Sequence, residues 1–190
     1  MEEYIDVLDE SGNYTGKSKE RGAVHTDGDW HKVIQIFIIN GNRILLQQRS
    51  LKKKSDPGKW CASASGHISA GETSYEAALK EFTEELGISV EKDKMILVDT
   101  FKSPSVTYNK GIKIFNNHFV DLYISTQEIN PEKLKIQEEE VEQVKFYTID
   151  EFTEMVQRRD ERLTNTPILF EHLLNAIKSQ NYNEKDDLNK

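Results

Sequence analysis

One segment, residues 33–48, constrains the fold more than any other part of this 190-residue chain. Residues 33–39 form a nearly continuous β-branched run, residues 40–42 (Asn-Gly-Asn) have a tight-turn composition, and residues 43–48 form a second strand-like run. β-branched residues favour strands, and an Asn-Gly pair between two such runs is typical of a β-hairpin. We therefore expect a hairpin here, at the centre of a sheet.

The other patterned segments predict strands and helices without a regular alternation of the two. Residues 4–8 and 14–16, separated by a turn composition, indicate an N-terminal hairpin. Strands are also expected around Trp60 and at residues 95–101, 111–124 and 143–147, and helices at residues 73–86, from Asp150 onward and from Pro167 onward. This order predicts an α/β or α+β class, with a mixed sheet sandwiched by helices.

The length of the chain indicates one domain with extensions, at roughly 150 residues per domain. We expect this domain to span residues 1–178, with the hairpin as an extension at about residues 1–22. Residues 179–190 are polar and aperiodic, so they are expected to form a disordered tail.

The charge balance limits the partners of the protein. Its 25 Lys and Arg against 33 Asp and Glu give a net charge of -8. This balance argues against a protein that coats nucleic acid or an anionic membrane, because neutralising phosphates requires surplus basic residues. The lone Cys61 cannot form an internal disulfide, the first residues lack the features of a signal peptide, and the longest apolar run is too short to span a bilayer. We therefore expect a cytoplasmic protein.

The first predicted helix concentrates acidic side chains. Thr73 and Glu76 form a capping-box pattern, which fixes the start of this helix. At about 100° per residue its apolar residues fall on one side, and Glu81, Glu84 and Glu85 share one arc beside them. Such carboxylates repel one another, and they are the oxygen ligands that Mg²⁺ requires. The alternative interpretation is a solvated acidic helix face.

Residues 66–72 (Gly-His-Ile-Ser-Ala-Gly-Glu) and, after a gap of seven, residues 80–88 (Lys-Glu-Phe-Thr-Glu-Glu-Leu-Gly-Ile) resemble the Nudix box, G-x5-E-x7-R-E-U-x-E-E-x-G-U with U aliphatic. The match covers 23 residues and departs from the pattern at Lys80, where the family has Arg, and mildly at Phe82. The resemblance implies a Nudix-type α/β/α sandwich. It also implies a hydrolase that cleaves a diphosphate linked to another group and uses Mg²⁺ or Mn²⁺.

The resemblance also implies roles for individual residues of the box. Glu84 and Glu85 would be metal ligands, and Glu81 would be a ligand or the base. Glu72 would bind the metal through water or tie the loop to the helix. The backbone carbonyl of Ser65, the residue before the box glycine, would be a further ligand.

Lys80 changes the chemistry of the box at one position. Arg can brace a carboxylate through two hydrogen bonds, whereas Lys presents a single point charge. Glu76 precedes Lys80 by four residues, which is the favourable order for an ion pair on a helix. We therefore expect Glu76 to hold Lys80 in part.

A narrower resemblance links the chain to the branch of the Nudix superfamily that includes isopentenyl-diphosphate isomerase. It rests on residues 23–26, His31, residues 48–50, Lys53, residues 57–60, Ser63 and residues 65–67. His25, His31 and His67 match the three histidines that the isomerases use. Ser65 stands in the place of their catalytic cysteine, and residues 116–118 (Asn-Asn-His) stand where they supply glutamates. Because a serine hydroxyl donates a proton poorly, a hydrolase of the isomerase-like branch is favoured.

Two charged segments are candidates for contacts with the substrate. A basic run before the box, which includes Arg49, Lys53 and Lys59, is either an electrostatic funnel for a diphosphate or a solvated loop. An acidic segment at residues 137–142 supplies either a second catalytic carboxylate, best placed at Glu139 or Glu140, or only a charged surface loop. His118 and His172 are expected to be ordinary structural histidines.

Together these patterns predict a MutT-like pyrophosphatase: a cytoplasmic hydrolase, dependent on Mg²⁺ or Mn²⁺, that cleaves a phosphoanhydride bond. The expected partner is a nucleoside diphosphate or triphosphate derivative or a similar diphosphate compound, and a homodimer is allowed. Neither a nucleic acid nor a membrane is expected as a partner. The alternatives are an isopentenyl-diphosphate isomerase and a non-catalytic sensor module that binds nucleotides.

Overall fold

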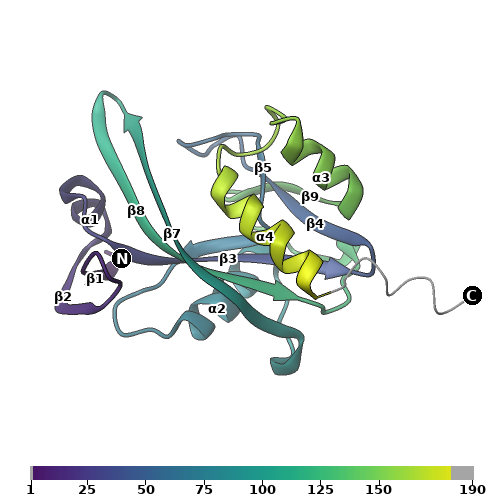
Figure 1. Ribbon diagram of the computed structural model, residues 1–190, viewed down its shortest axis with the longest axis horizontal. Coiled ribbons are helices and arrows are strands. Elements are labelled where there is room, and N and C mark those ends of the chain that lie inside the picture. The colour runs from purple at the N-terminus through teal and green to yellow at the C-terminus, as the bar shows by residue number, and fades with distance from the viewer. Residues whose placement is uncertain (1, 181–190) are drawn as a thin grey trace, which may run out of the picture.

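The computed structural model describes residues 2–180, which form a mixed sheet between two layers of helices and a separate N-terminal hairpin (Figure 1). The strands of the larger sheet are β3 (His31–Asn40), β4 (Arg43–Arg49), β5 (Trp60–Cys61), β6 (Ala64–His67), β7 (Met95–Asn109), β8 (Ile112–Ser125) and β9 (Val141–Thr148). The strand order is β5-β4-β3-β8-β7, with β6 paired to β3 and β9 paired to β4. Because β3 and β8 run parallel and the other pairs antiparallel, the sheet is mixed, as predicted.

The hairpin predicted at the centre of the sheet is confirmed. β3 and β4 pair antiparallel, with Ile39 opposite Ile44 and Asn40 opposite Arg43. Gly41 in the turn has φ +59°, a value that glycine adopts without steric cost. Alternate residues of β3 enter two different core clusters, since successive side chains of a strand point to opposite faces.

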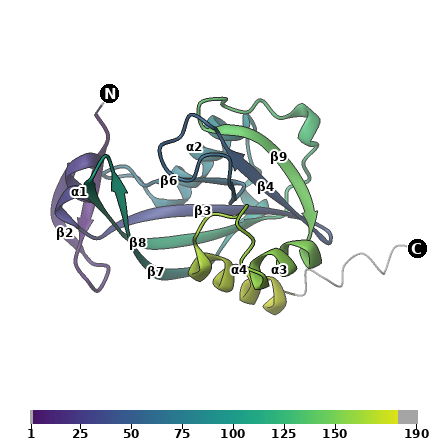
Figure 2. The ribbon, with the colours of Figure 1, turned by 90° about the horizontal axis from the view of Figure 1, so that it is seen from above.

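Helices cover both faces of this sheet, which gives the α/β/α sandwich (Figures 1 and 2). The helix α2 (Ser74–Leu86) buries Phe82 on one face. The helices α3 (Ile149–Gln157) and α4 (Pro167–Ser179) bury Phe152 and Leu173 on the other. Two 3-10 turns, η1 (Lys92–Lys94) and η2 (Pro131–Lys133), lie in the connections.

The N-terminal hairpin is present as β1 (Tyr4–Leu8) and β2 (Tyr14–Glu20), and it is followed by a short helix that the sequence did not predict. This helix, α1 (Arg21–Asp27), ends at Gly28, which has φ +78°. Ile5 and Val7 of β1 pack on Val24 of α1 in a small separate core. The hairpin and α1 together lie at one end of the sheet (Figure 1).

The strand β7 is longer than predicted, and with β8 it forms a ribbon that projects beyond the body of the sheet (Figure 1). The predicted strand ended at Phe101, whereas β7 continues through Pro104 to Asn109. Because β7 is an edge strand paired with β8, it tolerates a proline that lacks an N–H group.

Two expectations concern the ends and the surroundings of the chain. Of the tail predicted at residues 179–190, only the first two positions lie within the described residues. Ser179, the first of them, is the last residue of α4. Among the described residues, none of the helices has the length and apolar character needed to cross a membrane.

Candidate active site

Both ends of α2 are fixed by local structure, so the helix presents its carboxylates in a defined orientation. The predicted capping box is present: the Thr73 hydroxyl accepts a hydrogen bond from the Glu76 backbone N–H, and the Glu76 carboxylate accepts one from the Thr73 N–H. At the other end, Gly87 has φ +67° and donates its N–H to the Thr83 carbonyl. These contacts satisfy backbone groups that a helix end otherwise leaves open.

Glu85 is buried, in contrast to the polar position predicted for it. Its side chain reaches across the α2 face of the sheet, where Oε2 accepts hydrogen bonds from the Ser65 N–H and from Nε2 of Gln47, both at 3.0 Å. Burial raises the pKa of Glu85 to about 8, and the nearby charge of Glu81 contributes to this rise. Glu85 therefore links the helix to β6 and β4 and places Ser65, the predicted carbonyl ligand, beside the acidic cluster.

Glu81 lies directly against the backbone of Gly66. A Cβ atom built at position 66 would lie 2.1 Å from Oε1 of Glu81, so a residue larger than glycine would force the Glu81 side chain to move. Burial raises the pKa of Glu81 to about 7, with a further contribution from Glu84. Glu84 itself is exposed on the solvent side of the helix.

The donor set of this cluster fits a hard divalent cation. Burial and mutual repulsion disfavour the charged forms of Glu81 and Glu85, and a bound cation would reverse that preference. Both hydrogen bonds to Glu85 described above end on Oε2, which leaves Oε1 for such a cation. Carboxylate oxygens are the ligands that Mg²⁺ and Mn²⁺ prefer.

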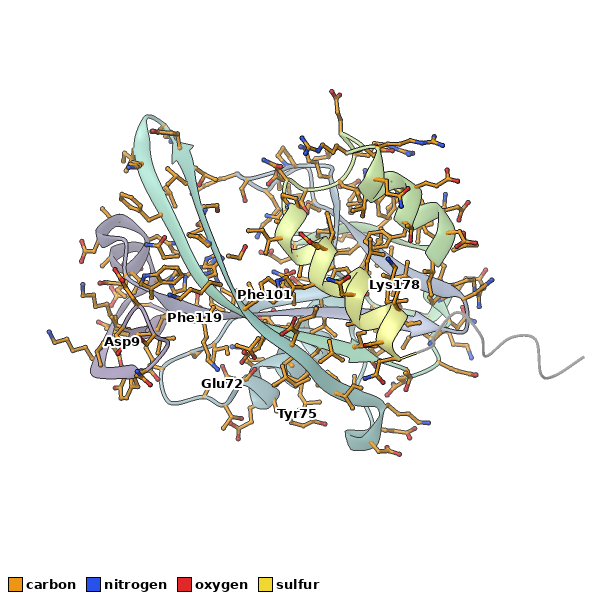
Figure 3. All side chains as sticks on the ribbon, in the orientation of Figure 1. Asp9, Glu72, Tyr75, Phe101, Phe119 and Lys178 are labelled. Atoms are coloured by element: carbon orange, nitrogen blue, oxygen red, sulfur yellow. The ribbon has the colours of Figure 1, made fainter. Side chains whose placement is uncertain are left out.

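Glu72 ties the loop before α2 to the helix, which is one of the two roles predicted for it. Its Oε2 accepts a hydrogen bond from the Ser69 N–H at 3.1 Å and lies 3.8 Å from Nζ of Lys80. The expectation that Glu76 holds Lys80 was wrong, because the capping box occupies the Glu76 carboxylate. Figure 3 places Glu72 near the start of α2, far from Lys178 on α4.

The predicted basic run and the predicted acidic segment lie together. Lys53 forms an ion pair with Glu140, and Nζ of Lys52 lies 3.7 Å from Oε1 of Glu139. The Ser50 N–H donates to the Glu140 carbonyl at 2.9 Å, so backbone contacts reinforce these pairs. The two segments therefore form one surface beside the box.

The other two cations predicted to bind substrate have partners within their own loop. Arg49 donates from Nε to the Ser55 carbonyl at 3.0 Å and from its guanidinium to the Ser55 hydroxyl. Nζ of Lys59 lies 3.6 Å from Oδ1 of Asp56. The basic run is therefore held by internal contacts.

Glu139 and Glu140, which the sequence left as equal candidates, differ in position. The charge of Glu140 contributes to the raised pKa of both Glu81 and Glu85. The side chain of Glu139 is 72% exposed and pairs with Lys52. Of these two residues, Glu140 is therefore the one whose charge acts on the carboxylates of the box.

The three histidines singled out by the isomerase resemblance come together, and His118 joins them. One ligand nitrogen from each of His25, His31, His67 and His118 lies within 4.8 Å of the others. The sequence treated His118 as structural, although its place in the segment where the isomerases supply glutamates could have identified it. His172 lies elsewhere, on α4, where its ring stacks on Phe101.

Comparisons with known proteins agree with this fold. Residues 29–166 match the family model of the NUDIX domain, so the chain belongs to the Nudix family. Relatives that match most of its length carry the name Nudix hydrolase, which makes it an enzyme of that class.

Three relatives illustrate the range of the family. Nudix hydrolase 3 of Arabidopsis thaliana is 43% identical over 84% of this chain, although the match spans only 21% of that longer protein. An uncharacterised Nudix hydrolase of Listeria monocytogenes is 35% identical over 80% of this chain and 82% of its own. An isopentenyl-diphosphate Delta-isomerase of Serratia proteamaculans is more distant, at 28% identity over 86% of this chain and 87% of its own.

Solved structures support the fold. The crystal structure of DR0079 from Deinococcus radiodurans covers 90% of this chain and 98% of its own, with a TM-score of 0.65 and 15% identity. A MutT NUDIX hydrolase from Burkholderia pseudomallei covers 76% of this chain and 98% of its own, with a TM-score of 0.56 and 20% identity. At these identities the likeness concerns the fold alone.

Proposed function

We propose that this Nudix hydrolase cleaves a phosphoanhydride bond in a nucleoside diphosphate or triphosphate derivative, or in a similar diphosphate compound, and that it requires Mg²⁺ or Mn²⁺. The observation that carries the proposal is the carboxylate cluster of α2, packed against the Ser65–Gly66 backbone. Glu81, Glu84 and Glu85 would hold the cation, with the Ser65 carbonyl as a further ligand. When bound, such an ion neutralises charge on the phosphate oxygens and lowers the pKa of a coordinated water.

The reaction needs a group that accepts a proton from water. The water oxygen forms a bond to one phosphorus, the bridging P–O bond breaks, and the leaving phosphate departs with the bridging oxygen. We assign the base to Glu140, whose charge acts on the carboxylates of the box, with Glu81 as the alternative within it. Glu139 is too exposed for this role, and Glu72 is assigned to holding the loop before α2.

The basic loop is proposed to bind the phosphates of the substrate. Lys53 and Lys59 each pair with a carboxylate in the free protein, and a diphosphate would compete for these cations. Movement of Lys53 to a phosphate would also affect the reaction, because it would release the Glu140 carboxylate from its ion pair. Arg49 is held by Ser55 at the start of this loop and offers a planar group suited to phosphate oxygens.

The proposal is tested by phosphate and pyrophosphate release over a panel of nucleotides and diphosphate compounds, with Mg²⁺, with Mn²⁺ and with a chelator. We expect turnover only with a divalent ion. Glu84→Gln should nearly abolish it without unfolding the chain, because this side chain is exposed. Glu154→Gln, at an exposed position on α3, is the matched control and should keep the wild-type rate. Wild-type turnover by the Glu84 variant at saturating metal would contradict the site assignment.

Isomerase activity is the second candidate, and the assembly of His25, His31 and His67 favours it. Ser65 opposes it, since the isomerases use a cysteine at this position. We expect isopentenyl diphosphate to remain unchanged, and dimethylallyl diphosphate formed at an enzymatic rate would overturn this expectation. Binding of a nucleotide without turnover on the whole panel would instead favour the sensor module.

We also propose that the enzyme acts in the cytosol, as expected for a chain with one buried cysteine and no disulfide. Its acidic charge supports a small-molecule substrate over a nucleic acid. A homodimer remains an expectation that sedimentation of the purified protein would test.

A further inference from the structure

Two neighbouring glutamines of β4 point to opposite faces of the sheet, since successive side chains of a strand alternate. Gln47 lies on the α2 face and is buried, with 2% of its surface exposed, whereas Gln48 is half-buried on the other face. Nε2 of Gln48 donates to the Gly58 carbonyl at 2.7 Å, and its Oε1 accepts from Nε2 of Gln143 at 2.7 Å. Both ends of the Gln48 amide are therefore used in holding the surrounding strands and loop together.

The Gln47 amide, in contrast, is bonded at one end only. Its Nε2 donates to Oε2 of Glu85 at 3.0 Å, whereas its Oε1 is buried and has no hydrogen-bond partner among the described residues. Its neighbours across the sheet, Cys61 on β5 and Val144 on β9, are small apolar side chains. A buried acceptor without a partner costs stability, so packing alone does not explain a glutamine at this position.

The contact with Gln47 determines which oxygen of Glu85 remains available. An ionised carboxylate only accepts hydrogen bonds, so the amide must turn its NH₂ group toward Glu85. The Gln47 amide on β4 and the Ser65 N–H on β6 both donate to Oε2 of Glu85. Two donors from different strands therefore hold one carboxylate oxygen and leave Oε1 unused.

We propose that Gln47, which lies outside the Nudix box, is a positioning residue of the metal site and presents Oε1 of Glu85 to the cation. A hydrogen bond to an ionised acceptor is stronger than one to a neutral acceptor, so the contact also favours the charged carboxylate that a cation requires. Residues that hold a metal ligand without touching the metal orient that ligand and raise the affinity of the site. The inference rests on the proposed function, because it takes the cation to bind at the carboxylates of α2.

The unpartnered oxygen of Gln47 fits the same role. Mg²⁺ gives up its water reluctantly and usually keeps several water molecules in a protein site. Those water molecules donate hydrogen bonds, so a loaded site supplies donors that the metal-free protein lacks. We assign Oε1 of Gln47 to accept one of them, and both ends of the amide are then used when the cation is bound.

A purely structural role for Gln47 leads to different expectations. Phe82 and Leu86 are fully buried and anchor α2 to the sheet, and the Ser65 N–H would still bind Glu85 if the Gln47 amide were removed. Leucine has a similar size and no polar atoms, so Gln47→Leu removes the amide and fills its space. The folded protein should therefore tolerate this change, whereas the metal site should not.

Binding of Mn²⁺ in the absence of substrate provides the direct test. Full-length protein, stripped of metal with a chelator and exchanged into chelator-free buffer, is titrated with Mn²⁺, and free Mn²⁺ is followed by electron paramagnetic resonance. Binding at the box is the part that Glu84→Gln abolishes. We expect Gln47→Leu to weaken this binding by about 10- to 100-fold, the usual effect of losing a residue that orients a ligand. Gln48→Leu is the matched control and should bind Mn²⁺ as the wild type does, because its amide faces away from α2.

Thermal unfolding without metal separates positioning from folding. Gln47→Leu should change the melting temperature by no more than about 4 °C. Gln48→Leu removes two hydrogen bonds and should lower the melting temperature at least as far. The first variant should therefore lose metal affinity and keep its stability, and the second should do the reverse. Gln47→Met keeps the unbranched shape and takes the place of the leucine variant if that one does not fold.

The metal dependence of turnover gives a third readout. The Mg²⁺ concentration at half-maximal turnover should rise in Gln47→Leu by the same factor as the Mn²⁺ dissociation constant. The KM for the substrate at saturating Mg²⁺ should stay unchanged, because Gln47 holds a metal ligand and does not contact the phosphates. A loss of folded protein alone would lower the amount of active enzyme without moving this Mg²⁺ concentration.

Three results would contradict the role of Gln47. If Glu84→Gln leaves Mn²⁺ binding unchanged, the cation does not sit at the box, and the proposed function fails together with this role. If Glu84→Gln loses Mn²⁺ while Gln47→Leu binds it as tightly as the wild type, the role of Gln47 alone is wrong. Equal weakening in Gln47→Leu and Gln48→Leu would also overturn it, because a loss shared by opposite faces comes from the strand and not from the amide.

Discussion

The Glu81 side chain lies so close to the Gly66 backbone that its position depends on the absence of a methyl group at position 66. A Cβ atom at position 66 would lie 2.1 Å from Oε1, 2.3 Å from Cδ and 2.7 Å from Cγ of Glu81. The backbone of Gly66 does not have a positive φ, so alanine is allowed there by conformation and excluded by contact alone. The box glycine therefore has a steric role in this chain.

We predict that Gly66→Ala displaces Glu81 and lowers metal-dependent turnover by on the order of 10²-fold, as misplacing a catalytic group does. Steady-state kinetics at saturating metal would measure this effect, with circular dichroism to establish folding. Gly71→Ala is the matched control, because position 71 has φ +78° and open space around it. It should strain the backbone and cost stability while affecting turnover less; the reverse order of the two effects would contradict the steric argument.

Glu139 and Glu140 offer a test in which neighbouring carboxylates have different environments. If Glu140 is the base, Glu140→Gln should lower kcat by on the order of 10² to 10⁴, with metal affinity little changed. Glu139→Gln should change kcat by less than about fivefold, since this side chain is mostly exposed. Small effects from both variants would transfer the role of base to Glu81.

The spacing of the box was sufficient to identify most residues of the candidate site, whereas their surroundings depend on tertiary contacts. The helical pattern could not show that β4 and β6 cover Glu85, because Gln47 and Ser65 are distant in sequence. His118 was expected to be structural, although its place in the segment at residues 116–118 was a signal that it could join the other three histidines. The sequence could have excluded Glu76 as the partner of Lys80, because the predicted capping box already used the Glu76 carboxylate.

The helices α2 and α3 both begin with a capping box. Each has a threonine N-cap and a glutamate at the third position, Thr73 with Glu76 and Thr148 with Glu151, and each shows both hydrogen bonds of a capping box. α2 carries the carboxylates of the box, whereas α3 lies on the opposite face of the sheet (Figure 2). The two helices therefore allow stability and activity to be separated.

We predict that Thr73→Ala and Thr148→Ala each lower the free energy of unfolding by about 1 kcal/mol, the usual cost of losing an N-cap. Urea denaturation would measure this loss. Phe82 and Glu85 also anchor α2, so turnover of the folded Thr73 variant should fall by no more than about threefold. A far larger loss of turnover for Thr73→Ala than for Thr148→Ala at equal stability would show that the cap itself sets the geometry of the site.

The elements that the sequence predicted are those with a strong local pattern, and those it missed depend on distant contacts. The central hairpin has a turn signal of its own. The starts of α2 and α4 also have local signals, a capping box in α2 and Pro167 at the first position of α4. α1 has seven residues and buries only Val24 from its own length, so its stability comes from packing against β1. The continuation of β7 through Pro104 depends on its edge position, which requires the full strand order.

Across the whole molecule, burial shifts two groups of titrating side chains in opposite directions. The carboxyls of Glu81 and Glu85 have pKa values raised to about 7 and about 8. The histidines of the cluster have lowered pKa values, about 4 for His31 and well below 6.5 for His67. In both sets the shift favours the neutral form of the side chain, so folding without a metal disfavours charge on these groups.

These shifts predict a stability maximum near pH 6.5 in the presence of a chelator. Below this pH the unfolded chain protonates histidines that the folded chain keeps neutral, so stability falls as the pH decreases. Above it the unfolded chain has already ionised glutamates that the folded chain keeps protonated, so stability falls as the pH rises through 7 and 8. Between pH 7 and pH 9 we expect a loss of about 1 kcal/mol, or about 2–4 °C in melting temperature.

Scanning calorimetry from pH 5 to pH 9 would record this profile, and two changes should alter only its alkaline side. Excess Mg²⁺ should remove the decline above pH 7, because a bound cation keeps Glu81 and Glu85 ionised in the folded state. Glu85→Gln should reduce the same decline without metal, because glutamine does not titrate. A metal-free stability that stayed level or rose from pH 7 to pH 9 would mean that these carboxyls are ionised in the folded protein without a cation.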